Sequence, residues 1–123
     1  MSVTAQEALF FLPAKDFERS KRFYADLGFT VAWSSGDLAR IEAGPAAFLL
    51  QRYYSSDTDG HLMMALTVDD ADAWWHRVVD QKLADRFGVL AEPPADRPWG
   101  RRDFPISDPT GVLWRIGHDL PKR

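Results

Sequence analysis

The sequence contains no cysteine among its 123 residues. Disulfide bonds, thiolate metal sites and thiol nucleophiles are therefore excluded. A chain that needs no disulfide is compatible with the reducing cytoplasm, and we expect a cytoplasmic protein.

The chain also lacks an excess of positive charge. Lysine and arginine together number 15, against 18 aspartate and glutamate residues, so the formal net charge is −3. A nucleic-acid-binding domain usually gathers a basic excess on one face. The chain offers only a small cluster of Arg97, Arg101 and Arg102, and we expect no nucleic-acid partner.

Long apolar runs are missing as well. No apolar stretch is long enough to span a bilayer. The N-terminal "MSVTAQEALFFLPAKDF" has neither the charged region nor the apolar region of a signal peptide. We therefore expect no membrane partner.

Familiar catalytic patterns are absent too. The sequence has no G-x-G-x-x-G or P-loop pattern, and no Ser/His/Asp set or carboxylate pair stands out. The histidines are His61, His76 and His118, and they are not spaced as paired metal ligands. We predict no catalytic residues.

Apolar and aromatic residues are plentiful. Hydrophobic residues make up 46% of the chain and aromatic residues 13%. This content suffices for one core, whereas the length is too short for two independent ones. We predict a single domain over residues 1–123, in which tryptophan and phenylalanine fill the core or offer flat stacking surfaces.

The first half of the chain predicts one strand, one helix and three further strands. Asp16 is the expected N-cap of the helix, and Gly28 is expected to end it in a left-handed conformation. The apolar and alternating runs predict strands at residues 8–14, 29–33, 38–43 and 46–54.

The second half repeats this order. A helix over residues 69–81 is expected to be capped by Asp69 or Asp70, and strands are predicted at 61–68, 87–91, 100–107 and 112–118. "GPAAFLLQR" aligns with "DPTGVLWRI", which places Gln51 opposite Arg115. The pattern predicts two like modules, about residues 5–55 and about residues 60–120, that share a core.

Three spaced segments resemble the vicinal oxygen chelate superfamily, which includes glyoxalase I, extradiol dioxygenases and bleomycin-resistance proteins. They are "LPAKDFERSKRFYADLGFTVAW", "LTVDDADAWWHRV" and "PWGRRDFPISDPTGVLWRI". The last is most similar to the bleomycin-resistance-like branch. The resemblance implies an α+β fold in which two βαβββ modules form a curved antiparallel cup, and a homodimer whose subunits both wall each cup.

The resemblance also implies four metal-ligand positions, which hold His, Gln or Glu in the metalloenzymes. They fall on Leu9, Gln51, Met63 and Arg115 of this chain. Leucine cannot ligate a metal, methionine is too soft for such a site, and arginine stays charged and repels the ion. We therefore expect no metal and no cofactor.

Arg115 lies in the middle of the last predicted strand, where a lone cation requires an explanation. Side chains alternate between the two faces of a strand, so Val112, Trp114 and Ile116 share the helix side while Arg115 faces the cup. Asp103 faces the cup from the preceding strand, which predicts a cross-strand ion pair. Either the pair alone accounts for Arg115, or Arg115 also contacts a ligand, and the sequence leaves both open.

The predicted cup is apolar with a few polar groups, as ligand pockets generally are. Trp99 in the "PWG" loop is the main candidate for stacking on a flat ring, whereas Arg40 and Glu42 could line either the cup or solvent. The candidate ligand-binding residues are Trp99, Arg115, Gln51, Tyr53, Asp103, Met63, Leu49 and Trp33.

We predict a metal-free protein that binds a small, partly aromatic, antibiotic-like molecule and acts by sequestration, in drug resistance or self-protection. Bleomycin-type glycopeptides, which the resemblance suggests, are cationic, and Arg115 disfavours a strongly cationic ligand. One alternative is a metal-dependent lyase or dioxygenase of the same superfamily, with its metal displaced towards His61 and Gln51. Another is a dimeric module that binds only a protein partner.

Overall fold

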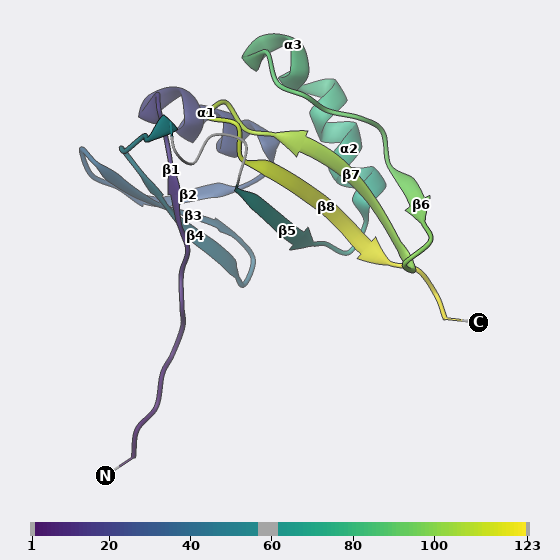
Figure 1. Cartoon of the computed structure of the whole chain (residues 1–123), viewed down its shortest axis with the longest axis horizontal. Coiled ribbons are helices and arrows are strands. Elements are labelled where there is room, and N and C mark those ends of the chain that lie inside the picture. The colour runs from purple at the N-terminus through teal and green to yellow at the C-terminus, as the bar shows by residue number, and fades with distance from the viewer. Residues whose placement is uncertain (1, 57–61, 123) are drawn as a thin grey trace.

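The computed structural model describes residues 2–56 and 62–122 (Figure 1). The first module consists of β1 (Phe11–Pro13), α1 (Phe17–Leu27), β2 (Thr30–Ser34), β3 (Leu38–Ala43) and β4 (Ala46–Gln51). The second consists of β5 (Met63–Thr67), α2 (Ala71–Asp80), α3 (Leu83–Phe87), β6 (Ala95–Arg97), β7 (Arg101–Ser107) and β8 (Leu113–Asp119).

The two modules have the same sheet topology. One sheet has the strand order β1-β4-β3-β2 and the other the order β5-β8-β7-β6. The predicted α+β class and the paired modules are confirmed. The sheets are mixed rather than purely antiparallel, because the first strand of each module runs parallel to the last. Such a parallel pair needs a crossover connection, and each module supplies one through its helices.

Local capping explains where the two main helices begin and end. The Asp16 carboxylate accepts a hydrogen bond from the Arg19 backbone N–H at 3.1 Å, and Gly28 ends α1 at φ 133°. Asp70 caps α2 by accepting from the backbone N–H groups of Asp72 and Ala73. These caps confirm the sequence predictions and settle the choice between Asp69 and Asp70.

The predicted strand at residues 87–91 is wrong. A short helix, α3, ends there instead, and the edge strand β6 lies in the segment expected to be a loop. Leu83 and Phe87 are four residues apart and both buried, so one helical turn places both on the core. Of the predicted strand, Ala91 alone makes an isolated bridge, to Ile106.

The first and last strands of the first module, β1 and β4, are shorter than predicted. The run at residues 8–14 forms a strand only over β1, and the strand expected at 46–54 ends at Gln51. Tyr53 consequently lies beyond β4, where strand alternation no longer fixes its direction.

The helices lie on one side of the two sheets, and no helix formed by the described residues covers the other side (Figure 1). The buried apolar residues form one cluster that draws on both modules and includes Tyr24, Phe48, Trp114 and Ile116. We call the opposite, helix-free side the open face. No helix in the described part of the chain is long and apolar enough to cross a membrane.

A buried polar network joins the modules inside this core. Tyr24 of α1 donates a hydrogen bond to Asp108 Oδ2 at 2.5 Å, and Trp114 Nε1 donates to the Tyr24 hydroxyl at 3.0 Å. Asp108 Oδ1 accepts from the backbone N–H groups of the turn that follows, those of Thr110, Gly111 and Val112, each at 2.9 Å. The network ties α1 to the hairpin between β7 and β8.

The protonation of Asp108 should be visible in the pH dependence of stability. Burial raises the pKa of its carboxyl, although the Tyr24 and backbone hydrogen bonds act in the opposite direction. A raised folded-state pKa gives a stabilising contribution that is complete below the unfolded value of 3.8 and is lost as pH rises through the folded value.

We therefore expect wild type to gain stability relative to Asp108→Asn as pH falls from about 7 to about 4. Urea unfolding of both proteins across this range measures the difference. A difference that shrinks on acidification would contradict the assignment.

Candidate functional site

On the open face of the first module, a row of residues crosses all four strands. The strand register places Phe11 beside Leu49, Leu49 beside Arg40, and Arg40 beside Trp33. Phe11 and Trp33 are 55% and 47% exposed, whereas Ile41, one position along β3, is buried. The row is therefore apolar and aromatic apart from one cation, and it faces away from the core.

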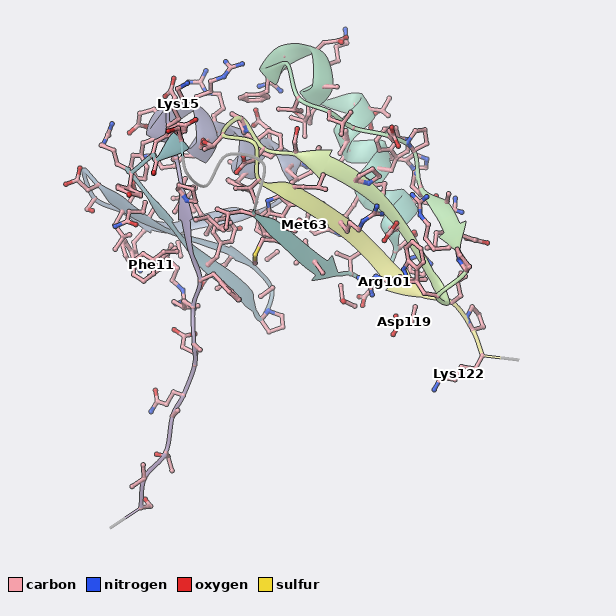
Figure 2. The ribbon with its side chains drawn as sticks, viewed as in Figure 1. Phe11, Lys15, Met63, Arg101, Asp119 and Lys122 are labelled. Carbon is pink, nitrogen blue, oxygen red and sulfur yellow. The ribbon has the colours of Figure 1, made fainter. Side chains whose placement is uncertain are left out.

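The second module shows the alternation predicted for its last strand. Trp114 and Ile116 are buried, and Arg115 lies on the opposite face between Ala65 of β5 and Pro105 of β7. The side chain of Met63 lies below β5, on the side away from the helices (Figure 2). Arg115 and Met63 thus share the open face.

Arg115 makes the predicted ion pair with Asp103, and Asp103 also pairs with a second arginine. Arg115 Nη1 lies 3.1 Å from Asp103 Oδ1. Arg97 Nε of β6 lies 2.9 Å from the same oxygen, and Arg97 Nη2 donates to the Asp103 backbone carbonyl. The Asp103 side chain is buried, with 2% of it exposed. We call Arg97, Asp103 and Arg115 the arginine–aspartate cluster.

Gly117 provides the space for this cluster. It pairs with Asp103 across β7 and β8, and a Cβ atom at position 117 would lie 2.5 Å from both Asp103 Cβ and the Arg102 carbonyl oxygen. Glycine within a strand often marks such a close approach. The absence of a side chain at Gly117 therefore lets Asp103 lie flat against β8.

Arg101 extends the cationic surface towards the end of the same sheet. Its Nη2 donates to the carbonyl oxygens of Leu66 and Gly117 and to the Thr67 hydroxyl, and its Nη1 lies 3.3 Å from the exposed carboxylate of Asp119. Figure 2 shows Arg101 and Asp119 together at this end of β7 and β8.

In the first module, two carboxylates balance the positive charge of Arg40 and accept hydrogen bonds from all three of its side-chain nitrogens. Glu7 accepts hydrogen bonds from its Nη1 and Nη2, and Glu42 accepts one from its Nε. The hydrogen bonds to Arg40 lower the pKa of the Glu7 carboxyl. The register with Leu49 places Arg40 on the open face. The sequence alone did not decide whether Arg40 lines the cup or faces solvent.

The sequence-predicted ligand residues are distributed over both modules. Arg115 and Asp103 are in contact, and Leu49 and Trp33 lie in one row with Arg40 between them. Gln51 ends β4, Met63 begins β5 and is 62% exposed, and Trp99, in the turn between β6 and β7, is also 62% exposed. Tyr53 follows β4 and is 57% exposed.

Three residues that shape the open face were not among the candidate site residues chosen from the sequence. Phe11 was missed because the sequence did not fix where β1 begins. Arg97 was missed because its segment was expected to be a loop rather than the edge strand β6. Gly117 carried a usable signal, because a glycine inside an otherwise apolar strand suggests that another group approaches closely.

The position that corresponds to Met63 in the first module is Phe11 rather than Leu9. Phe11 pairs in parallel with Leu49, as Met63 does with the equivalent Leu113, whereas Leu9 precedes β1. The four positions implied for a metal therefore carry Phe11, Gln51, Met63 and Arg115. Only glutamine among these four offers a hard donor atom.

The histidines are placed away from the open face or outside the described residues. His118 Nδ1 accepts a hydrogen bond from the Ala71 backbone N–H at the start of α2, and His76 is exposed on α2. His61 lies outside the described residues. Within the described ranges, no group of three His, Cys, Asp or Glu side chains could hold a metal ion.

Two hollows of the described surface lie beside helices. One, of about 730 Å³, is lined by residues of α1 and α3 such as Arg22 and Phe87. The other, of about 440 Å³, lies between the β3–β4 turn and the start of α2, beside Trp74. Neither includes a candidate ligand residue. The candidate site is instead an exposed aromatic and cationic surface.

A family model described as the Glyoxalase/Bleomycin resistance protein/Dioxygenase superfamily matches residues 7–116. No curated protein matches the sequence.

Solved structures show the same fold. A bleomycin-binding protein from bleomycin-producing Streptomyces verticillus, complexed with copper(II)-bleomycin, has a TM-score of 0.76 at 23% identity, covering 98% of this chain and 100% of that one. TnmS3, an antibiotic binding protein from Streptomyces sp. CB03234, has a TM-score of 0.74 at 26% identity, covering 97% and 99%. The fosfomycin resistance protein FosX from Mesorhizobium loti has a TM-score of 0.70 at 16% identity, covering 96% and 95%.

Proposed function

The chain belongs to the glyoxalase/bleomycin resistance protein/dioxygenase superfamily, and on this premise we propose that it binds a small, partly aromatic, antibiotic-like molecule on its open face and sequesters it without chemical change. Similar structures include bleomycin-binding and antibiotic-binding proteins, which supports the antibiotic-like class of ligand. The physiological role would be drug resistance or self-protection in the cytoplasm.

The observation that carries this proposal is the side-chain chemistry at the implied metal positions. Phe11, Met63 and Arg115 replace hard ligands, and only Gln51 could bind such an ion. A site of this kind does not fit a divalent metal, so we assign no reaction step to one. Binding requires only that aromatic and polar groups converge on the ligand.

The ligand would contact aromatic side chains of both modules. Trp33 and Trp99 are exposed and can stack on a flat ring, while Gln51 and the arginine–aspartate cluster orient its polar groups. We also propose a homodimer. Exposed aromatic residues such as Phe11 and Trp33 favour coverage by another surface, and a second copy would enclose the ligand between two open faces.

The proposal is tested by titrating the protein with a panel of planar antibiotics and following tryptophan fluorescence. For a member that binds, Trp99→Ala should weaken binding about tenfold or more, because the stacking surface is removed. Val79→Ala, at an exposed position of α2 on the helix side, is the control and should bind as wild type does.

If no antibiotic of the panel quenches the tryptophan fluorescence of wild type, the result would instead favour a module that binds only a protein partner. Stoichiometric Fe, Mn, Ni or Zn in the purified protein, together with a function that is lost on chelation, would favour the lyase or dioxygenase alternative. Native mass spectrometry reports the metal, the oligomeric state and any retained small molecule together.

A further inference from the structure

Building on the proposed function, we infer that the ligand carries a carboxylate or a similarly flat anionic group, and that Arg115 binds this group. The arginine–aspartate cluster combines an excess positive charge with an open hydrogen-bonding edge.

The cluster carries more positive than negative charge. Arg97 and Arg115 both donate to a single oxygen, Oδ1 of Asp103. One carboxylate balances one guanidinium, so the three side chains together retain a charge of about +1. Asp103 is buried, and Arg97 and Arg115 have 24% and 36% of their side chains exposed. An excess charge that is partly shielded from water is stabilised by a counter-ion.

Arg115 has the geometry to receive that counter-ion. Only Nη1 is hydrogen-bonded within the described residues, to Asp103, so the edge formed by Nε and Nη2 has no protein acceptor there. Its register neighbours Ala65 and Pro105 are uncharged. Two parallel N–H groups on one guanidinium edge match the two oxygens of a carboxylate.

The other arginines of the open face differ in this respect. Arg40 directs all three of its donor nitrogens to Glu7 and Glu42. Arg101 directs Nη2 to backbone and hydroxyl oxygens and Nη1 to Asp119, whose side chain is 84% exposed. Arg101 therefore adds to the positive potential, while Arg115 offers the open edge.

A cationic ligand would be disfavoured at the same place. Its positive group would meet a guanidinium that the shared carboxylate does not neutralise, and like charges repel strongly where water is partly excluded. We therefore expect a flat aromatic anion as the ligand. This ligand differs in charge from the bleomycin with which relatives of the chain were solved.

The test uses three probes with the same ring and different head groups: naphthoate, naphthamide and naphthylmethylammonium. Each is titrated by NMR into wild type, Arg115→Gln and Arg22→Gln, following the backbone amides of β4 and β8 and the Arg115 Nε–H signal. Arg115→Gln leaves Asp103 paired with Arg97, so the fold is retained. Arg22→Gln removes the same charge from an exposed position on α1.

We expect wild type to bind naphthoate at least about tenfold more tightly than the other two probes, with the Arg115 Nε–H signal shifting. Arg115→Gln should abolish this preference, and Arg22→Gln should keep it. Equal binding of all three probes, or a preference that survives in Arg115→Gln, would overturn the inference and leave the proposed function standing. No shift on the open face with any probe at millimolar concentration would overturn both.

Discussion

Tyr24→Phe is expected to destabilise the protein by about 3–5 kcal/mol, far more than the loss of one hydroxyl usually does. The hydroxyl is both donor and acceptor in the core: it donates to Asp108 Oδ2 and accepts from Trp114 Nε1. Its removal leaves a buried carboxylate oxygen and a buried indole N–H without partners. Each unsatisfied group carries a desolvation penalty of about 1–3 kcal/mol, and the penalty is larger for a charged one.

Urea unfolding followed by tryptophan fluorescence measures this loss. Tyr53→Phe is the matched control, because Tyr53 is exposed beyond β4, and it should change stability by less than about 0.5 kcal/mol. A second variant, Tyr24→Phe combined with Asp108→Asn, should recover part of the loss, since the amide carries no charge to bury. Equal stability of Tyr24→Phe and wild type would show that the network contributes little.

Gly117→Ala should have the next largest effect, a loss of about 2–4 kcal/mol. The added Cβ would lie 2.5 Å from Asp103 Cβ and from the Arg102 carbonyl oxygen. Neither atom is the end of a flexible side chain, so β7 and β8 must separate locally. Because the clash falls on Asp103, the ion pairs to Arg97 and Arg115 should be disturbed as well.

Gly36→Ala separates this steric effect from the general consequences of replacing glycine. A Cβ at Gly36 would meet no atom within 4 Å. The free energy of unfolding of this variant should therefore differ from that of wild type by less than about 0.5 kcal/mol. If Gly117→Ala proved as stable as Gly36→Ala, the close approach of Asp103 to β8 would not require glycine at position 117.

Much of the fold could be predicted from the sequence, because the relevant signals are local. The caps Asp16, Gly28 and Asp70 act within one helical turn. The alternation that buries Trp114 and leaves Arg115 on the open face is a property of a single strand. Three spaced sequence segments also resemble the family, whose model matches residues 7–116.

The edge strand β6 shows where local signals were insufficient. Residues 87–91 had the apolar character of a strand, yet Leu83 and Phe87 gain burial by forming a helical turn on the core. The following segment, with its two prolines, pairs with β7 instead. Tertiary contacts rather than intrinsic propensity decided this region.

By itself the sequence determined the two modules, their main helices α1 and α2, and the unsuitable chemistry of the implied metal positions. Only the tertiary structure decided that Asp103 serves two arginines, that Gly117 makes room for it, and that Phe11 rather than Leu9 matches Met63. The physical reason is that these facts depend on the pairing register between strands far apart in the chain, and a shift of one residue would move each side chain to the other face.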